Sequence, residues 1–212
     1  MELELVSLNV GKAETYVYKG KEFVSAIAKR AVTGSMPLAV SPLPEDEQAD
    51  QVHHGGPDKA ICAYFHDHYP YWENVLERPL APGAFGENFT LRGAVEADVR
   101  IGDTFRLGDA LLQVSQPRVP CYKLSARHER PTLEAEVTAS GFTGFYFRIL
   151  APGSAAAGDR LRLEAADPAG VTVAEANRLM HRDKDDHAGL RRLLDVDALA
   201  ESWRTQLSKR LK

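Results

Sequence analysis

One cysteine, Cys121, lies in a stretch whose residues could give its thiol reactive chemistry. Pro117 and Pro120 precede it and restrict the backbone, which predicts a stiff, non-helical arm leading to the thiol. Arg118 and Lys123 are close in sequence, and nearby cations favour the thiolate form of a cysteine, which binds metals or attacks electrophiles. Many lone cysteines are instead small buried hydrophobes without chemistry, so both interpretations stay open.

The segment 53–59, which reads His-His-Gly-Gly-Pro-Asp-Lys, is a second candidate and would bind an anion. The adjacent Gly55 and Gly56 let backbone N–H groups approach a ligand, and Lys59 or a protonated histidine would add positive charge. Gly-Gly-Pro-Asp is also an ordinary turn sequence, and paired histidines are more often structural than ligands. The apolar run that follows makes Cys62 a core residue, and we do not expect it to lie near Cys121.

The elements that must position these stretches are mostly short strands. Tight Gly-Asp turns at residues 102–103 and 108–109 separate several of them, which indicates a curled or barrel-like antiparallel sheet rather than βαβ units. The expected strands are residues 3–10, 16–18, 23–24, 38–40, 98–101, 104–107, 111–115, 142–150 and 161–163.

Helical patterns interrupt and then follow the strands. One helix is expected after residue 66, with Asp67 near its cap and Pro70 in its first turn, and another over 123–139, interrupted by Pro131. The acidic run 45–47 is interpreted as a solvated loop.

The composition changes from strand-like to helical at residues 167–170, which predicts a barrel domain over 1–167 and a three-helix segment over 168–212. A capping box at 172–175 opens the first helix of the tail, residues 187–194 form the second, and Asp197 is expected to cap a third that reaches Arg210. The tail is either a docking module or a cap that packs on the barrel.

Composition excludes several classes of function. The chain has 30 acidic and 26 basic residues and a formal net charge of −4, so no global basic field exists for binding nucleic acid or an anionic membrane. The sequence lacks an apolar run of membrane-spanning length and a signal-peptide pattern, which predicts a cytoplasmic protein. Two cysteines fit a reducing compartment better than a disulfide framework.

Taken together, four motifs resemble those of the MOSC domain family, the molybdenum cofactor sulfurase C-terminal domains. They are 54–60 (HGGPDKA), 86–89 (GENF), 101–103 (IGD) and 113–124 (QVSQPRVPCYKL), and the helical tail is similar to that of the YiiM-like subgroup. The resemblance implies a mixed α+β fold, mainly an antiparallel β-barrel core with peripheral helices. It also implies a molybdenum cofactor (molybdopterin) whose metal is bound by one protein cysteine, which Cys121 matches.

The resemblance further implies a reductase of N-hydroxylated compounds, such as 6-N-hydroxylaminopurine, that detoxifies them with electrons from a separate reductase. A homodimer is possible, and His54 or Asp58 could supply a proton to the reaction. Glu87 and Asn88 could hydrogen-bond the cofactor or only order their loop. The candidate cofactor-binding residues are Gly55, Gly56, Lys59, Glu87, Asn88, Arg118, Lys123 and Arg148.

Three other functions stay open. Cys121 could carry a persulfide and deliver sulfur to a metal site elsewhere, as a sulfur carrier without a metal of its own. The protein could also bind the pterin without catalysis and use its helical tail for docking. A zinc hydrolase that uses His53, His54 and Cys121 is the least favoured, because adjacent histidines rarely bind one ion.

Overall fold

Seven strands form a closed barrel in the computed structural model, which describes residues 1–39, 41–50 and 55–211. They are β1 (Glu2–Val10), β6 (Ile61–Phe65), β7 (Phe89–Arg92), β8 (Thr104–Leu107), β9 (Ala110–Pro117), β10 (Phe145–Ala151) and β12 (Arg160–Ala165). The order is β12-β8-β9-β10-β6-β7-β1, and β12 also pairs with β1, which closes the ring. β6 and β7 are parallel while the other neighbours are antiparallel, so the predicted mainly antiparallel barrel is confirmed.

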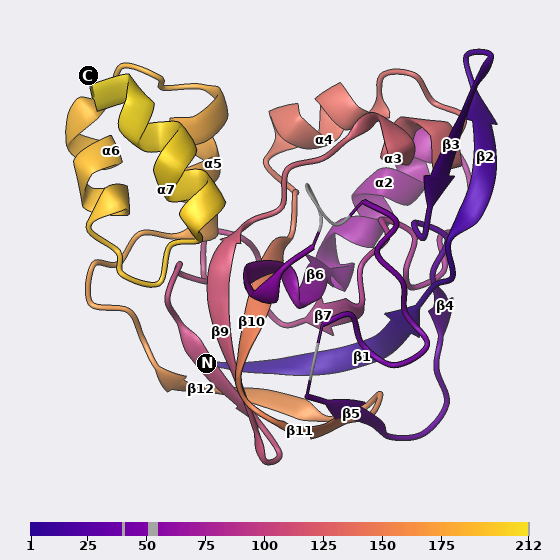
Figure 1. Ribbon diagram of the computed structural model, residues 1–212, viewed down its shortest axis with the longest axis horizontal. Coiled ribbons are helices and arrows are strands. Elements are labelled where there is room, and N and C mark those ends of the chain that lie inside the picture. The colour runs from indigo at the N-terminus through magenta and orange to yellow at the C-terminus, as the bar shows by residue number, and fades with distance from the viewer. Residues whose placement is uncertain (40, 51–54, 212) are drawn as a thin grey trace.

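Shorter strands lie around the barrel. The predicted hairpin is present as β2 (Glu14–Tyr18) and β3 (Lys21–Ser25), and it extends away from the barrel (Figure 1). Its turn residues Lys19 and Gly20 have positive φ angles of 50° and 75°, which suits the twist of a tight hairpin. β4 (Arg30–Ala31) pairs with the end of β1, and β5 (Met36–Leu38) pairs with β11 (Gly153–Ala155).

The helices form two groups (Figure 1). α2 (Tyr69–Leu76), α3 (Tyr122–Arg127) and α4 (Leu133–Ser140) lie together over one part of the barrel. The tail helices α5 (Val173–His181), α6 (His187–Leu194) and α7 (Glu201–Ser208) form a separate group beside β9. Three short 3-10 helices complete the described secondary structure: η1 (Pro57–Lys59), η2 (His66–His68) and η3 (Lys209–Leu211).

The tail shares its core with the barrel. Barrel residues such as Leu112 and Val114 belong to the same buried apolar cluster as Leu179, Leu193 and Trp203 of the tail. Each fully buried side chain of this kind contributes about 1.5–3 kcal/mol relative to an exposed one. The predicted cap that packs on the barrel is therefore the arrangement that the structure has.

Most predicted elements are found near their expected bounds, but one strand is not. Residues 98–101 form turns, with a single isolated bridge between Arg100 and Thr172. Val99 and Ile101 are nevertheless fully buried, because this segment packs under the start of the tail. The alternation of apolar and polar residues in this segment therefore reflects the burial of Val99 and Ile101 and does not indicate a strand. The strand expected over 38–40 is displaced to β5, and Val40 lies outside the described residues.

Two predicted helix caps are wrong. Asp67 lies inside η2 and accepts a hydrogen bond from the Gly93 amide, whereas α2 begins after His68 without a side-chain cap. Asp197 precedes the third tail helix by several residues, and the cap position of α7 is Ala200. Thr172 is confirmed as the cap of α5, because its hydroxyl accepts a hydrogen bond from the Glu175 amide at 3.0 Å, while the Glu175 carboxylate pairs with Arg178 and Arg192.

Candidate functional site

Cys121 occupies the point where the arm that follows β9 enters α3. Its backbone is extended, with φ −136° and ψ 165°, and its carbonyl accepts the first helical hydrogen bond from the Leu124 amide. Residues 118–120 belong to no helix or strand, so the predicted non-helical arm is confirmed. The Cys121 side chain is partly exposed and lines two adjoining cavities.

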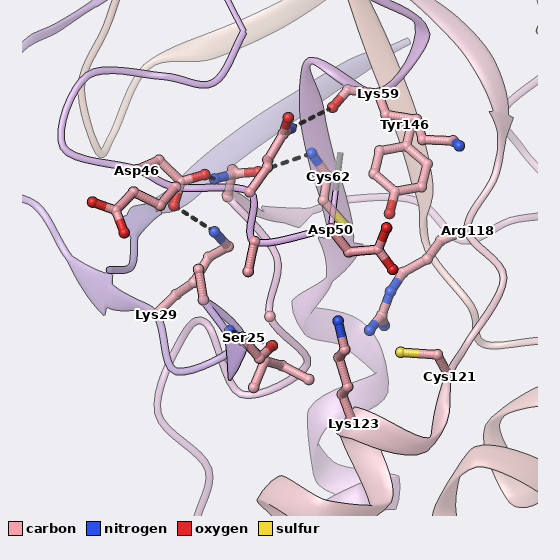
Figure 2. A pocket seen from close by; sticks show the side chains of 17 residues that line it. Ser25, Lys29, Asp46, Asp50, Lys59, Cys62, Arg118, Cys121, Lys123 and Tyr146 are labelled. Atoms are coloured by element: carbon pink, nitrogen blue, oxygen red, sulfur yellow. Dashed lines mark hydrogen bonds and ion pairs between the residues drawn. The ribbon is translucent and has the colours of Figure 1, made fainter. Parts of the chain in front are cut away.

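The first of these, which we call the inner cavity, lies between the barrel and the arm and has about 630 Å³ of empty volume. Distant parts of the chain meet in it: the loop after β3, the loop that contains Asp46, β6, the arm and β10. Its polar and sulfur-containing lining residues include Ser25, Lys29, Asp46, Asp50, Lys59, Cys62, Asn88, Arg118, Cys121, Lys123 and Tyr146 (Figure 2).

Arg118 is the unusual group in this cavity. It is only 7% exposed, yet its guanidinium makes no hydrogen bond to another described residue, and its Nη1 atom is fully buried without a partner. The guanidinium extends into the cavity, and the Lys123 amine and the Cys121 sulfur point toward the same region (Figure 2). A buried cation normally has a partner, so this arrangement has unused capacity to bind an anion.

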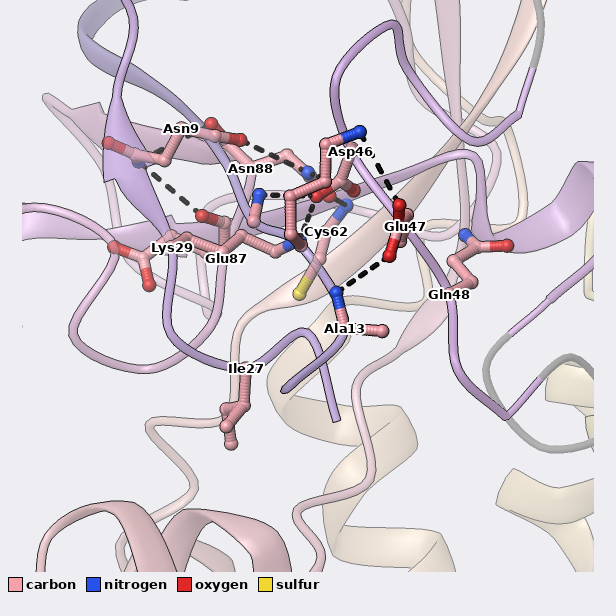
Figure 3. Close-up of polar contacts among 12 residues, drawn as sticks. Asn9, Ala13, Ile27, Lys29, Asp46, Glu47, Gln48, Cys62, Glu87 and Asn88 are labelled. Atoms are coloured by element: carbon pink, nitrogen blue, oxygen red, sulfur yellow. Dashed lines mark hydrogen bonds and ion pairs between the residues drawn. The ribbon is translucent and has the colours of Figure 1, made fainter. Parts of the chain in front are cut away.

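Lys29 and Asn88 form a polar network along the opposite wall (Figure 3). The Lys29 amine lies 2.5 Å from Asp46 Oδ1, and both side chains are more than nine-tenths buried. Asn88 donates from Nδ2 to Asp46 Oδ2, and its Oδ1 accepts a hydrogen bond from the Cys62 amide. The interpretation of residues 45–47 as a solvated loop is therefore wrong for Asp46, because a buried lysine balances its charge.

Cys62 reaches the inner cavity, which corrects our expectation that it lies away from Cys121. It is 7% exposed, and burial raises the pKa of its thiol to about 11, so it is a neutral thiol at pH 7. Burial also raises the pKa of Tyr146, helped by the neighbouring Cys62, so the Tyr146 hydroxyl keeps its proton. Arg118 interacts electrostatically with both of these residues and with Cys121.

Lys59 and Lys123 contribute further positive charge at the mouth of the inner cavity. Burial lowers the pKa of Lys59, although nearby Asp58 and Asp50 act in the opposite direction. Lys123 lies in the first turn of α3, two residues after Cys121. Both lysines also line the second cavity, so they lie where the two spaces meet.

The second space, which we call the outer cavity, lies between the arm and the helical tail. It has about 1,120 Å³ of empty volume and shares Cys121 and Tyr146 with the inner cavity. One wall consists of Val119 and Pro120 of the arm and Tyr122 of α3. The other consists of Ser202, Trp203 and Gln206 of α7. The tail therefore contributes side chains to the space in front of Cys121.

Glu87 orders a loop and does not line either cavity. Its carboxylate is fully buried and accepts hydrogen bonds from the amides of Gly83 and Phe85 and from the hydroxyls of Tyr69 and Thr90. Four donors from the same chain satisfy this carboxylate, which supports the loop-ordering interpretation. Its neighbour Asn88 does line the inner cavity.

Asp58 and Arg148 lie outside both cavities and bind each other. Arg148 donates to Asp58 Oδ1 from two nitrogens, at 3.0 and 2.8 Å, and also to Gln113. Asp58 Oδ2 accepts a hydrogen bond from the Glu201 amide at the start of α7. This pair therefore connects η1 to β10 and to the tail, and the structure does not bring the two residues to Cys121.

The glycine segment that precedes η1 is also separate from the inner cavity. Gly56 has φ 95° and lines a different surface pocket with Ser41 and Ile149, and Gly55 lines neither cavity of the site. His53 and His54 lie outside the described residues. Within the part of the chain that the structure describes, no three His, Cys, Asp or Glu residues gather as metal ligands.

Sequence reasoning found the arm and three cations of the inner cavity, Lys59, Arg118 and Lys123, but missed Cys62, Tyr146, Lys29 and Asp46. All four lie on other elements, and their patterns are those of ordinary strands or polar loops. All five residues of β6 are buried, so this strand has no polar face in its sequence. Hydrophobic periodicity alone therefore cannot tell which of its side chains faces a cavity.

This barrel with a cysteine arm and a helical tail defines the class to which the protein belongs. Residues 50–162 match the model of the MOSC domain, and residues 171–212 match that of the YiiM-like, 3-alpha helix domain. The chain belongs to the MOSC domain family, in its YiiM-like form.

Individual relatives agree with this assignment. The chain is 44% identical over 206 residues to the uncharacterized protein YflK of Bacillus subtilis, covering 97% of this chain and 93% of that protein. It is 39% identical over 209 residues to protein YiiM of Escherichia coli, covering 97% and 91%. The crystal structure of YiiM from Geobacillus stearothermophilus superposes with a TM-score of 0.85 at 37% identity, covering 99% of this chain and all of that one.

A more distant relative has a functional name. A protein of Gibberella moniliformis named "Reductase" is 38% identical over 148 residues, which cover 68% of this chain and 26% of that longer protein. Among the described residues, every helix is too short or too polar to cross a membrane.

Proposed function

We propose that the inner cavity binds a molybdenum cofactor and that the protein reduces N-hydroxylated compounds with electrons from a separate reductase. The observation that carries this proposal is the buried guanidinium of Arg118, whose Nη1 atom has no partner among the described residues, in the same cavity as the Cys121 thiol. A pterin cofactor combines an anionic phosphate with a soft metal, and this cavity offers cations and a thiol together. The residues of the site therefore fit the group.

Each side chain would have a distinct role. Cys121 would bind the metal through its sulfur, while Arg118, Lys123 and Lys59 would balance the negative charge of the pterin and its phosphate. The Lys29–Asp46 pair keeps Asn88 in place on the opposite wall, so that wall is fixed before the ligand arrives. The Tyr146 hydroxyl remains protonated, interacts with the Cys62 side chain and lines both cavities.

The bound cofactor would supply two-electron redox chemistry, which no side chain provides. The overall reaction is R–NHOH + 2e⁻ + 2H⁺ → R–NH₂ + H₂O, so the N–O bond breaks and its oxygen leaves as water. Reduction of 6-N-hydroxylaminopurine, a detoxification reaction, is the specific case we propose. The fungal relative named "Reductase" supports this class of reaction.

The test is the metal and pterin content of protein purified from a host that makes the cofactor. Wild type should contain about one molybdenum per chain, and Cys121→Ser should contain almost none. Cys62→Ser serves as the matched control, because Cys62 is the other thiol of the same cavity and has no proposed metal-binding role. Absence of molybdenum from wild type, or full retention by Cys121→Ser, would refute the proposal.

A second function is a persulfide carrier that uses Cys121. The observation that favours it is the second thiol, Cys62, in the same cavity and in electrostatic contact with the same arginine. Cyanide releases sulfane sulfur from a persulfide, so the same preparations distinguish the two functions. Cyanide-labile sulfur in wild type but not in Cys121→Ser, with molybdenum absent from both, would establish the carrier.

A further inference from the structure

The inner and outer cavities adjoin each other at Cys121. Asp50, Lys59, Cys121, Lys123 and Tyr146 line both of them. The remaining lining residues differ in chemistry: the inner cavity has Lys29, Asp46 and Arg118, whereas the outer cavity has side chains from the arm and from α7. If the anionic cofactor occupies the inner part, the outer part is the space that remains for a substrate.

The arm and the start of α3 present an apolar surface to the outer cavity. Val119 and Tyr122 keep 43% and 45% of their surface exposed, although large apolar side chains are usually buried. The Tyr122 ring is supported on its other side by an edge contact with Phe23 of the hairpin, at 5.3 Å between centroids. Such a surface suits a flat apolar face of a ligand.

The opposite wall adds hydrogen-bonding groups. Ser202 donates to Gln116 Oε1 at 3.1 Å, and Gln116 in turn donates to the Pro117 carbonyl, so Gln116 is engaged. Gln206 is one helical turn further along α7. Its exposed side chain makes no hydrogen bond to another described residue. Its amide therefore has two donors and an acceptor available at the outer cavity.

This wall is held rigidly against the barrel. The Ala200 amide donates to the Ser115 carbonyl at 3.0 Å, and the Glu201 amide donates to Asp58 Oδ2 at 3.3 Å. Trp203 is only 2% exposed and belongs to the shared apolar core. The start of α7 is thus fixed to the strand that leads to Cys121, so the wall has a defined distance from the thiol.

We propose that α7 is the substrate-selecting wall of the site and that Gln206 is its specificity-determining residue. The outer cavity accepts a flat heteroaromatic ring, with one face against Val119 and Tyr122 and a polar edge on the Gln206 amide. This inference rests on the proposed function, because the inner cavity must be the cofactor side. It gives the three-helix tail a role in recognition besides its packing.

Binding of a flat amino-substituted heterocycle, which is the product type of the reaction, tests this inference without the cofactor. Isothermal titration of adenine into the metal-free full-length chain should give a dissociation constant at least tenfold weaker for Gln206→Leu than for wild type. Thr205→Ala is the matched control, since Thr205 is exposed on the same helix, its hydroxyl donates to Glu201 and it does not line the cavity. It should bind as wild type does.

Equal affinities for wild type and Gln206→Leu, or no binding by wild type at millimolar concentration, would overturn the inference. A matching thermal unfolding midpoint for each variant shows that the fold is intact. The two proposals fail separately. A molybdenum-loaded enzyme whose KM for an N-hydroxylated heterocycle is unchanged in Gln206→Leu contradicts only the role of α7, whereas Gln206-dependent adenine binding by a chain that never takes up molybdenum contradicts only the cofactor.

Discussion

Glu87 and Arg118 are both charged and both buried, but their surroundings differ. Glu87 accepts four hydrogen bonds from its own chain, while the Arg118 guanidinium forms none with the described residues. Burying a charge is costly unless it is compensated, so a carboxylate satisfied internally stabilises its loop, whereas a cation without a partner reduces stability unless a ligand binds. Glu87 is therefore a structural group, whereas Arg118 is the group that we propose binds a ligand, although both lie in family motifs.

The largest effect on stability is expected for substitution of Glu87. Replacing Glu87 with Gln turns one acceptor oxygen into a donor that faces other donors, so the free energy of unfolding should fall by about 4 kcal/mol. Urea unfolding followed by circular dichroism measures this change. Glu22→Gln is the control, since Glu22 is exposed, and it should change stability by less than about 0.5 kcal/mol. A small effect at Glu87 would mean that its hydrogen bonds do not order the loop.

A second, smaller effect concerns His128, which packs against the same loop. Its Nε2 atom donates to the Ala84 carbonyl at 2.8 Å, and its Nδ1 atom accepts from Arg78 at 2.8 Å, so both nitrogens are satisfied only in the neutral ring. Burial lowers the pKa of His128 from 6.5 to about 4.

Because the folded-state pKa of His128 is lowered, the unfolded chain binds more protons between pH 6.5 and pH 4. Its stabilising contribution is complete above pH 6.5 and is lost as the pH falls toward 4, by about 3 kcal/mol. Urea unfolding at several pH values should show this slope in wild type and a shallower one in His128→Gln. Identical slopes would show that His128 titrates normally in the folded state.

The Asp58–Arg148 pair should have a still smaller effect on stability. Both side chains are partly exposed, so a double-mutant cycle with Asp58→Asn and Arg148→Met should give a coupling energy of about 1 kcal/mol. Because neither residue lines a cavity of the site, molybdenum content should stay at the wild-type level in both single variants. Loss of molybdenum from Arg148→Met would show that Arg148 does contribute to cofactor binding.

Much of the fold follows from the sequence, because local patterns carry it. The Gly-Asp turns, the helix break at Pro131 and the Thr172 cap are local signals, and each structure formed where it was predicted. The strand predicted over residues 98–101 is wrong, because burial under the tail produces the same alternation of apolar and polar residues as a strand does. Barrel closure between β1 and β12 joins the two ends of the barrel and has no local signal.

The site was predictable only where its residues are neighbours in sequence. Arg118, Cys121 and Lys123 lie close together in the sequence, on the arm and at the start of α3, and were identified together. Cys62 and Tyr146 come from β6 and β10, and the pairing of Tyr146 with Cys62 across those strands brings them to the cavity. Asp58 was expected to supply a proton and Arg148 to bind the cofactor phosphate, but the two side chains pair with each other outside both cavities, and their roles stay predictions.

Arg118, whose Nη1 atom has no partner among the described residues, is the group that we propose binds the cofactor, and Arg118→Met removes its charge. Methionine is unbranched, as arginine is, but carries no charge. The substitution keeps the hydrogen bond from the residue 118 amide to the Gly144 carbonyl. It removes a buried charge, so stability should change by less than about 1 kcal/mol or increase.

The decisive measurement is therefore molybdenum per chain and unfolding free energy on the same Arg118→Met preparation from a cofactor-producing host. If Arg118 binds the cofactor, this variant should lose molybdenum at least tenfold while its stability is preserved. Full molybdenum content together with a loss of several kcal/mol would contradict it, because Arg118 would then be a structural residue like Glu87.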